Sequence, residues 1–151
     1  QKHYYAAFDE ILSDPHAFSD PVQELNVTDG REGYLEMEAI YRVKGKNSVT
    51  WANTYFHELN AIQELKVDVL EAGEYAVTLR ALGVPAETRI RFEAGASSNE
   101  VDLVQGKKFH PIGRVCLDAG EQTFAFTLLE TADLEGVGKM GLYSLSLKKT
   151  N

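Results

Sequence analysis

Apolar and polar residues alternate with a period of two along most of the chain from residue 34 onward. Strict alternation is typical of β-strands that bury one face, whereas helices repeat their apolar residues every three to four positions. The alternating or β-prone runs are short; they cover residues 34–43, 50–56, 62–70, 74–82, 88–93, 101–104, 112–117, 122–129 and 140–147. About nine short strands with little helix predict an all-β fold, a two-sheet antiparallel β-sandwich of the jelly-roll type.

Two nearly identical turns organise these strands. Residues 70–75 read LEAGEY and residues 117–122 read LDAGEQ, and each turn joins two alternating runs. A short acidic-Ala-Gly link predicts a β-hairpin, because glycine adopts positive φ without a steric penalty. Antiparallel strands reverse direction one after another. If both turns and the loop at 94–99 share one end, four longer connections share the other: 57–61, 83–87, 105–111 and 130–138. Binding sites usually lie in such loops.

The first 31 residues differ from the rest. Aromatic and aliphatic residues recur at helical spacing between Tyr4 and Leu12, and the SDP sequence at 13–15 would end a helix. We therefore expect an N-terminal helix or linker segment at 1–31, followed by one β-sandwich domain at 32–151.

Composition narrows the classes of function. The chain has 151 residues and a formal net charge of −8, which argues against nucleic-acid binding because a phosphate backbone requires a clustered basic face. No apolar stretch approaches the ~18 residues that span a bilayer, so no membrane partner is expected, and we expect a monomer. Cys116 is the only cysteine, which excludes an intrachain disulfide. Since it lies between Val115 and Leu117, we predict a small buried side chain.

Three stretches resemble a galactose-binding-like β-sandwich: residues 51–77, residues 109–120 with the sequence FHPIGRVCLDAG, and the closing strand at 142–147. Domains of this family are appended to bacterial glycoside hydrolases, sulfatases and polysaccharide lyases, and many are carbohydrate-binding modules. The resemblance implies a polysaccharide or oligosaccharide ligand, a parent catalytic domain in a longer chain, and a secreted, periplasmic or cell-surface location. The binding function that the resemblance implies requires no cofactor. Many members hold a structural calcium ion, and Glu36 and Glu38 are the nearest match to its ligands, although the usual acidic residue on the last strand is absent.

Sugars are bound by aromatic faces and by planar polar groups. Seven residues in or near the long loops offer these groups: Trp51, Tyr55, His57, Asn60, Lys107, His110 and Glu135. Trp51 has two interpretations, an exposed sugar platform or a core residue between the sheets, and we favour the core. For the cluster from Tyr55 to Asn60, a hydrated rim explains the composition equally well. The basic-aromatic segment 107–110 is a candidate for contact with an anionic glycan, although a charge pair is more often a solvated face.

Nothing in the sequence favours catalysis. The chain lacks a nucleophile elbow, a phosphate loop, a glycosidase carboxylate signature and metal-type histidine spacing, so we expect no catalytic residues. Five arginines lie in predicted strands, and for most of them we expect ion pairs across strands rather than contacts with a glycan: Arg42, Arg80, Arg89, Arg91 and Arg114. The main hypothesis is a non-catalytic carbohydrate-binding module. The alternatives are a ligand-free accessory sandwich packed on a parent enzyme, and a polysaccharide lyase or hydrolase that uses a set such as Tyr55, His57 and Arg42.

Overall fold

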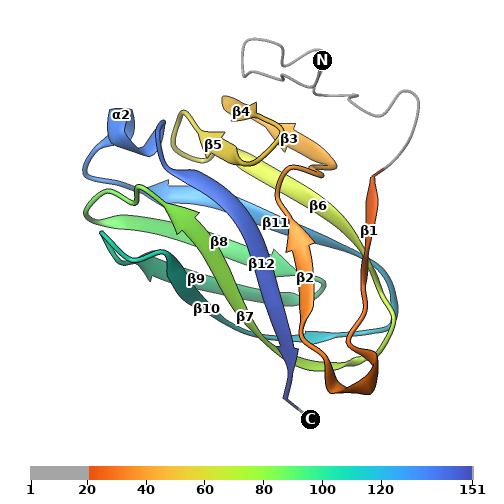
Figure 1. The fold of residues 1–151 in the computed structure, drawn as a ribbon. Helices are drawn as coiled ribbons and strands as arrows, with labels where there is room; N and C mark the ends of the chain where they lie inside the picture. Colours follow the sequence, from red (N-terminus) through yellow and green to blue (C-terminus); the bar gives the residue numbers. More distant parts are fainter. Residues whose placement is uncertain (1–20, 151) are drawn as a thin grey trace.

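The computed structural model describes residues 21–150, which form two β-sheets packed face to face (Figure 1). The back sheet contains, in spatial order, β1 (Val22–Leu25), β6 (Ile62–Val69), β11 (Gly120–Glu130), β8 (Thr88–Ala94) and β9 (Ser97–Leu103), with β3 (Arg42–Lys44) also paired to β6. The front sheet contains β10 (Phe109–Leu117), β7 (Gly73–Leu82), β12 (Gly141–Lys149), β5 (Thr54–Phe56) and β4 (Asn47–Val49), with β2 (Gly33–Glu36) also paired to β12. Helix within this range is confined to η2 (Thr28–Gly30) and α2 (Leu134–Val137). The predicted all-β sandwich is confirmed.

The two acidic-Ala-Gly turns are not hairpins, so that prediction is wrong. β6 and β7 flank the first turn but lie in different sheets, and so do β10 and β11, which flank the second. Each turn therefore carries the chain from one sheet to the other. The two crossings are neighbours, since Gly120 pairs with Val69 and Leu117 pairs with Gly73. Period-two alternation reports which face of a strand is buried, not which strand is its partner, so the sequence could not separate a crossing from a hairpin.

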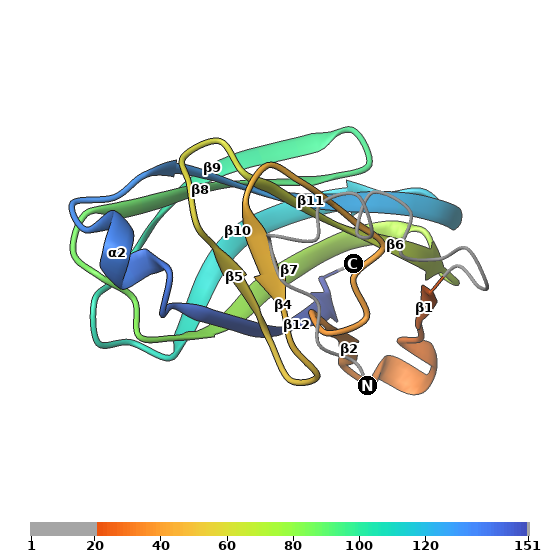
Figure 2. The same cartoon turned by 90° about the horizontal axis from the view of Figure 1, so that it is seen from above.

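The predicted grouping of the loops is confirmed by the strand directions. β7 runs antiparallel to both β10 and β12, and β11 runs antiparallel to both β6 and β8. Consequently the connections after β5, β7, β9 and β11 all lie at one end, which we call the loop end. In Figure 2, α2 marks this end on the left-hand side. The two crossings and the tight β8–β9 hairpin lie at the opposite end. Half of the predicted loop at 94–99 belongs to β9, which begins at Ser97, and Ala94 is the last residue of β8.

The core lies between the sheets and is built from the inward-facing residues of both. On the back sheet, the Phe92 ring lies edge-on to Phe124 and 4.9 Å from the centroid of Phe126. On the front sheet, Leu79 of β7 and Leu145 of β12 are fully buried. Alternation along the strands therefore fixes one face of each sheet in the core and leaves the other face for surface chemistry.

Two expectations about the first part of the sandwich require correction. β1 lies before the predicted domain boundary at residue 32, yet it pairs with β6, so the sandwich already includes residues from Val22 onward. The predicted continuous strand at 34–43 is broken: β2 ends at Glu36, a turn follows, and β3 begins at Arg42 in the other sheet. The predicted N-terminal helix falls within residues 1–20, outside the described residues.

Two register shifts change which side chains of the front sheet face outward. In β10 the pairing with β7 shifts between Pro111 and Gly113, and Gly113 has φ of 111°. Phe109 and Pro111 face outward before this shift, whereas Val115 and Leu117 face the core after it. Cys116, between the two core residues, is exposed, so the prediction of a buried thiol is wrong. In β12 a similar shift falls between Leu142 and Ser144. Such bulges re-aim side chains without ending the strand.

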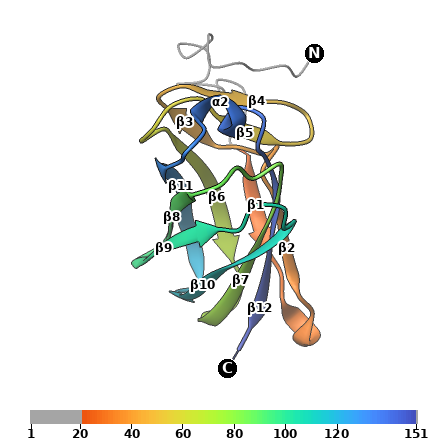
Figure 3. The same cartoon turned by 90° about the vertical axis from the view of Figure 1, so that its left-hand side faces the viewer.

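A buried polar network attaches β4 and β5 to the back sheet. Figure 3 shows the ribbons of these two strands at the top of the sandwich. Gln63 of β6 accepts a hydrogen bond from the Thr54 hydroxyl at 2.6 Å and donates to Asn47 Oδ1 at 3.1 Å. Asn47 Nδ2 in turn donates to the carbonyl of Lys44 at 2.9 Å. All three side chains of the network have no solvent exposure. Because each buried group has a partner, the network fixes how β4 and β5 cross the loop end.

Candidate functional site

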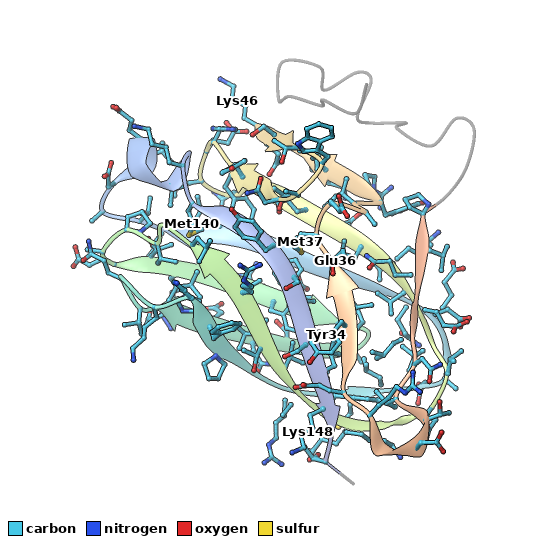
Figure 4. The ribbon with its side chains drawn as sticks, viewed as in Figure 1. Tyr34, Glu36, Met37, Lys46, Met140 and Lys148 are labelled. Carbon is cyan, nitrogen blue, oxygen red and sulfur yellow. The ribbon has the colours of Figure 1, made fainter. Side chains whose placement is uncertain are left out.

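A shallow groove crosses the outward face of the front sheet. The strand registers align outward-facing residues in two transverse rows, one of Phe109, Arg80, Ser144 and Glu36, and one of Pro111, Thr78, Ser146 and Tyr34. The groove has a volume of about 200 Å³ and its lining residues are Glu32, Tyr34, Thr78, Arg80, Phe109, Ser144 and Ser146. Figure 4 shows Tyr34 and Glu36 on β2, between Lys46 at the loop end and Lys148 at the opposite end.

Two aromatic side chains form the rims of the groove. Tyr34 on β2 is 63% exposed and Phe109 at the start of β10 is 62% exposed. The order β10-β7-β12-β2 separates them by three strand spacings, or roughly 14 Å at ~4.8 Å per strand. Exposed aromatic side chains of this size are unusual on a sheet surface and mark a binding face when they flank polar groups.

The Tyr34 ring is held in place by Glu32. Its hydroxyl donates to Glu32 Oε1 at 2.8 Å. That hydrogen bond, with the nearby negative charge, raises the pKa of Tyr34, so the phenol stays neutral at physiological pH. The ring face is thereby presented in a defined orientation, and the Glu32 carboxylate is already engaged.

The floor of the groove combines hydroxyl groups with one guanidinium. Ser144 and Ser146 on β12 are half-buried, because their neighbours Leu145 and Leu147 occupy the core face. On β7, the guanidinium carbon of Arg80 lies 4.9 Å from the centroid of the Tyr143 ring, a cation–π distance. The stack occupies a face of the guanidinium and leaves its N–H edges for hydrogen bonds.

Arg80 differs from the other strand arginines in having no carboxylate partner within residues 21–150. The prediction that most of these arginines form ion pairs across strands is confirmed. The observed pairs are Arg42–Glu64, Arg89–Glu100, Arg89–Asp102, Arg91–Glu100 and Arg114–Glu74. Arg80 therefore carries a positive charge that the described part of the protein does not neutralise locally.

The loop end has a separate, more open hollow of about 570 Å³. It lies between three of the four long connections, and its lining residues are Gly83, Val84, Pro85, Ala86, Gln105, Gly106, Asp133, Gly136 and Lys139. None of the seven predicted binding residues lines it, and the connection at 57–61 does not contribute. Asp133 caps α2 by accepting from the Gly136 amide at 2.9 Å, so its carboxylate is part of the local fold.

The predicted aromatic and amide residues near β5 occupy different environments. Trp51 is 67% exposed, so the interpretation that placed it in the core is wrong. The reason is that the turn between β4 and β5 lies outside the two packed faces. Tyr55 is half-buried on β5 opposite Ser48. Asn60 is exposed at a loop position with φ of 67°, and its backbone N–H donates to the Leu128 carbonyl at 2.7 Å.

The two predicted histidines are both held by hydrogen bonds within the protein. Ser48 Oγ lies 2.7 Å from His57 Nε2, and burial lowers the pKa of His57. His110 is only 3% exposed. Its Nδ1 accepts from the Val104 amide at 3.4 Å and its Nε2 donates to the Lys107 carbonyl at 3.0 Å, while burial lowers its pKa. His110 therefore shapes the loop that precedes Phe109 rather than presenting its ring to solvent.

The remaining predictions at this end concern charged residues. Lys107 and Glu135 are exposed, the first in the β9–β10 loop and the second on α2. Neither lines the hollow, although their neighbours Gly106 and Gly136 do. The loops were thus correctly grouped, but the side chains that face their common space were not predicted.

No group of three or more His, Cys, Asp or Glu side chains suited to a metal ion occurs among residues 21–150. Glu36 ends β2 and Glu38 lies in the following turn, so the two carboxylates do not lie on one strand. A structural calcium ion needs six to eight oxygen ligands, and these two residues do not form such a set by themselves. Calcium binding there stays a prediction.

The fold is similar to that of two domains of known structure. The CBM36-1 domain of a multidomain xylanase from the hindgut metagenome of Trinervitermes trinervoides is 16% identical with a TM-score of 0.53, and the match covers 80% of this chain and 98% of that domain. The C-terminal CBM6 domain of a marine laminarinase from Zobellia galactanivorans is 12% identical with a TM-score of 0.53, and the match covers 78% of this chain and 99% of that domain. The fold is thus a carbohydrate-binding-module-like β-sandwich.

A longer enzyme contains the same fold. The GH26-CBM35 β-(1,4)-mannanase of Podospora anserina is 16% identical with a TM-score of 0.61, and the match covers 80% of this chain but only 28% of the enzyme. No family model and no curated protein matches the sequence. At these identities the similarity defines the fold alone. None of the helices formed by residues 21–150 is long and apolar enough to cross a membrane.

Proposed function

We propose that this protein is a non-catalytic carbohydrate-binding module and that the front-sheet groove binds the glycan. The observation that carries the proposal is the pairing of two exposed aromatic rims, Tyr34 and Phe109, with a floor of hydroxyls and one arginine. A pyranose ring has an apolar C–H face and an equator of hydroxyl groups. Stacking on an aromatic face and hydrogen bonding to planar or hydroxyl groups satisfy both parts at once.

The groove supports binding rather than chemistry. Its lining contains a single carboxylate, Glu32, which already accepts the Tyr34 hydroxyl, whereas a glycosidase of the usual type needs two facing carboxylates. The set proposed for a lyase is not arranged as a unit, since Arg42 pairs with Glu64 and His57 with Ser48. The near-complete coverage of two isolated binding domains also favours a binding role.

Attachment to a catalytic domain in a secreted, periplasmic or cell-surface protein is part of the same proposal. The neighbours in a mannanase, a xylanase and a laminarinase belong to polysaccharide-degrading enzymes. A module of this kind would raise the effective concentration of such an enzyme on its polymer even with weak affinity at each site.

The test measures binding of the wild-type protein to mannan, xylan, β-1,3-glucan and acidic polysaccharides by affinity electrophoresis and calorimetry. We expect Tyr34→Ala and Phe109→Ala to weaken binding at least tenfold, because truncating a buried aromatic contact commonly costs 1–3 kcal/mol or more. Trp51→Ala is the matched control, since Trp51 is as exposed as the rim residues but does not line the groove.

The outcomes separate the possible locations. Loss of binding in Trp51→Ala with unchanged binding in the two rim variants would transfer the site to the turn between β4 and β5. Absence of binding to every polymer by the wild-type protein would contradict the proposed function and favour the ligand-free accessory sandwich.

A further inference from the structure

We infer that the groove selects acidic glycans and that Arg80 binds the oxyanion of the sugar, a carboxylate or a sulfate. This inference rests on the proposed function of the groove and specifies its ligand. It starts from the one charged group on the groove floor, the Arg80 guanidinium.

The position of Arg80 argues for an external partner. Four other strand arginines have a carboxylate within 4 Å, at distances from 2.7 Å for Arg42 to 3.7 Å for Arg89, and Arg80 has none within residues 21–150. The protein has a net charge of −8, so acidic side chains are plentiful, and Arg80 is the one strand arginine among residues 21–150 that forms no ion pair with them. A bound oxyanion would provide the missing partner.

The surroundings of Arg80 hold it in the geometry that an oxyanion needs. The Tyr143 ring supports a face of the guanidinium at 4.9 Å. Across the neighbouring strands, Phe109 and Ser144 flank Arg80, and neither carries a negative charge. No ion pair joins Arg80 to a carboxylate of residues 21–150, so its N–H groups can form a forked contact to two oxygen atoms of a ligand.

Charge is distributed unevenly across the groove. Lys107 and Lys108 immediately precede Phe109 and are exposed, so positive charge gathers at the β10 rim together with Arg80. Glu32 and Glu36 lie at the β2 rim, and Glu32 is engaged by Tyr34. We therefore infer that the acidic sugar lies between Phe109 and Arg80, while an uncharged part of the chain lies against Tyr34.

The experiment uses pairs of polymers that share a sugar backbone and differ in whether it carries the acidic group. De-esterified homogalacturonan is compared with its methyl-esterified form, and a sulfated galactan is compared with its chemically desulfated form; the two pairs distinguish carboxylate from sulfate. We expect at least one acidic polymer to bind about tenfold more tightly than its neutral counterpart, because a hydrogen bond to a charged group contributes about that factor or more.

Variants at Arg80 then assign the effect. Arg80→Gln should lower affinity for the acidic polymer about tenfold and leave affinity for the neutral polymer within about twofold. Arg80→Lys keeps the charge without the planar fork, so its affinity for the acidic polymer should lie between those of wild type and Arg80→Gln. Arg91→Gln on the back sheet makes the same change in net charge at an arginine paired with Glu100, and should leave binding unchanged. A native circular dichroism spectrum of each variant excludes misfolding as the cause.

Two results overturn the inference and leave the proposed function standing: wild-type binding to neutral polymers that equals or exceeds binding to their acidic counterparts, and an equal loss for both forms in Arg80→Gln. The second result would mean that Arg80 contacts sugar hydroxyls. Failure of the wild-type protein to bind any polymer overturns the inference together with the proposed function.

Discussion

Phe109 and Arg80 are direct cross-strand partners on β10 and β7, and both face away from the core. Six and eight residues later, the same strand places Val115 and Leu117 in the core. The register shift at Gly113 makes both placements compatible, because an extra residue exchanges the inward and outward faces of β10. The binding face and the core thus depend on one irregularity in an edge strand.

Gly113→Ala should destabilise the protein and weaken glycan binding. The residue has φ of 111°, and a Cβ atom there would lie 2.8 Å from Asn99 Nδ2. We expect the free energy of unfolding to fall by roughly 1–3 kcal/mol in urea titrations. Gly106→Ala is the matched control, since Gly106 also has positive φ but has open space around it. An equal cost in both variants would show that backbone strain alone, and not the contact with Asn99, makes glycine necessary.

Asn47→Ala should be strongly destabilising. Asn47 is fully buried, donates to three backbone carbonyls and accepts from Gln63 at 3.1 Å. Removing the amide leaves Gln63 Nε2 without its acceptor, so we expect a loss of about 3 kcal/mol in the free energy of unfolding. Ser98→Ala on exposed β9 should change stability by less than about 0.5 kcal/mol. A loss below 1 kcal/mol in Asn47→Ala would mean that water replaces the amide and that the network does not fix β4 and β5.

Tyr34→Phe should separate stacking from hydrogen bonding at the β2 rim. The substitution keeps the ring and removes the hydroxyl that donates to Glu32 at 2.8 Å. If stacking on the ring face provides the affinity, Tyr34→Phe should bind glycan within about threefold of wild type, whereas Tyr34→Ala should lose at least tenfold. Calorimetry on the same polymer measures both. Equal losses in the two variants would assign the affinity to the hydroxyl.

Stability should decrease as the pH falls below 6.5. Burial lowers the pKa of His57 and His110 below their ordinary value of 6.5, so both rings stay neutral in the native state under conditions where the unfolded chain takes up protons. The unfolded state then binds more protons, and the free energy of unfolding decreases until the pH lies below the native pKa values.

Urea titrations at about pH 7.5 and about pH 5.5 measure this decrease. His110→Gln should remove part of it. The Glu74 carboxylate, whose pKa is lowered by hydrogen bonds from Thr150 and Arg114, adds a separate loss only as the pH falls below 4.5. Stability that stays constant between the two pH values would show that the rings take up protons without unfolding.

Cys116 should react with a thiol reagent in the native protein. Its side chain is exposed on β10 between two buried residues. We expect complete modification by an aromatic disulfide reagent without denaturant, with a second-order rate within about tenfold of that in urea. Protection of the thiol until the protein unfolds would contradict the outward orientation that the register shift gives to this part of β10.

The groove itself was only partly visible in the sequence. Tyr34 precedes the apolar Leu35, and Ser144 and Ser146 alternate with Leu145 and Leu147. This alternation alone predicts that the tyrosine and the two serines face outward. That these residues share a face with Phe109 could not be read, because β2, β12, β7 and β10 become neighbours only through the order of the sheet. The predicted loops do lie at one end of the sandwich. His110, however, is buried and donates to the Lys107 carbonyl of the loop before it, which the sequence did not indicate.

The sequence by itself determined the all-β class and the end of the sandwich that carries the long connections, because period-two alternation and glycine turns are local properties of the chain. It did not determine the number of strands, since about nine were predicted and β1 to β12 are observed within residues 21–150. Tertiary structure decided that the two similar turns cross between sheets, that Cys116 and Trp51 are exposed, and that Arg80 lacks a carboxylate partner within residues 21–150. These features depend on strand pairing and on register shifts at single residues. Pairing energy is summed over residues distant in sequence, and no local pattern records it.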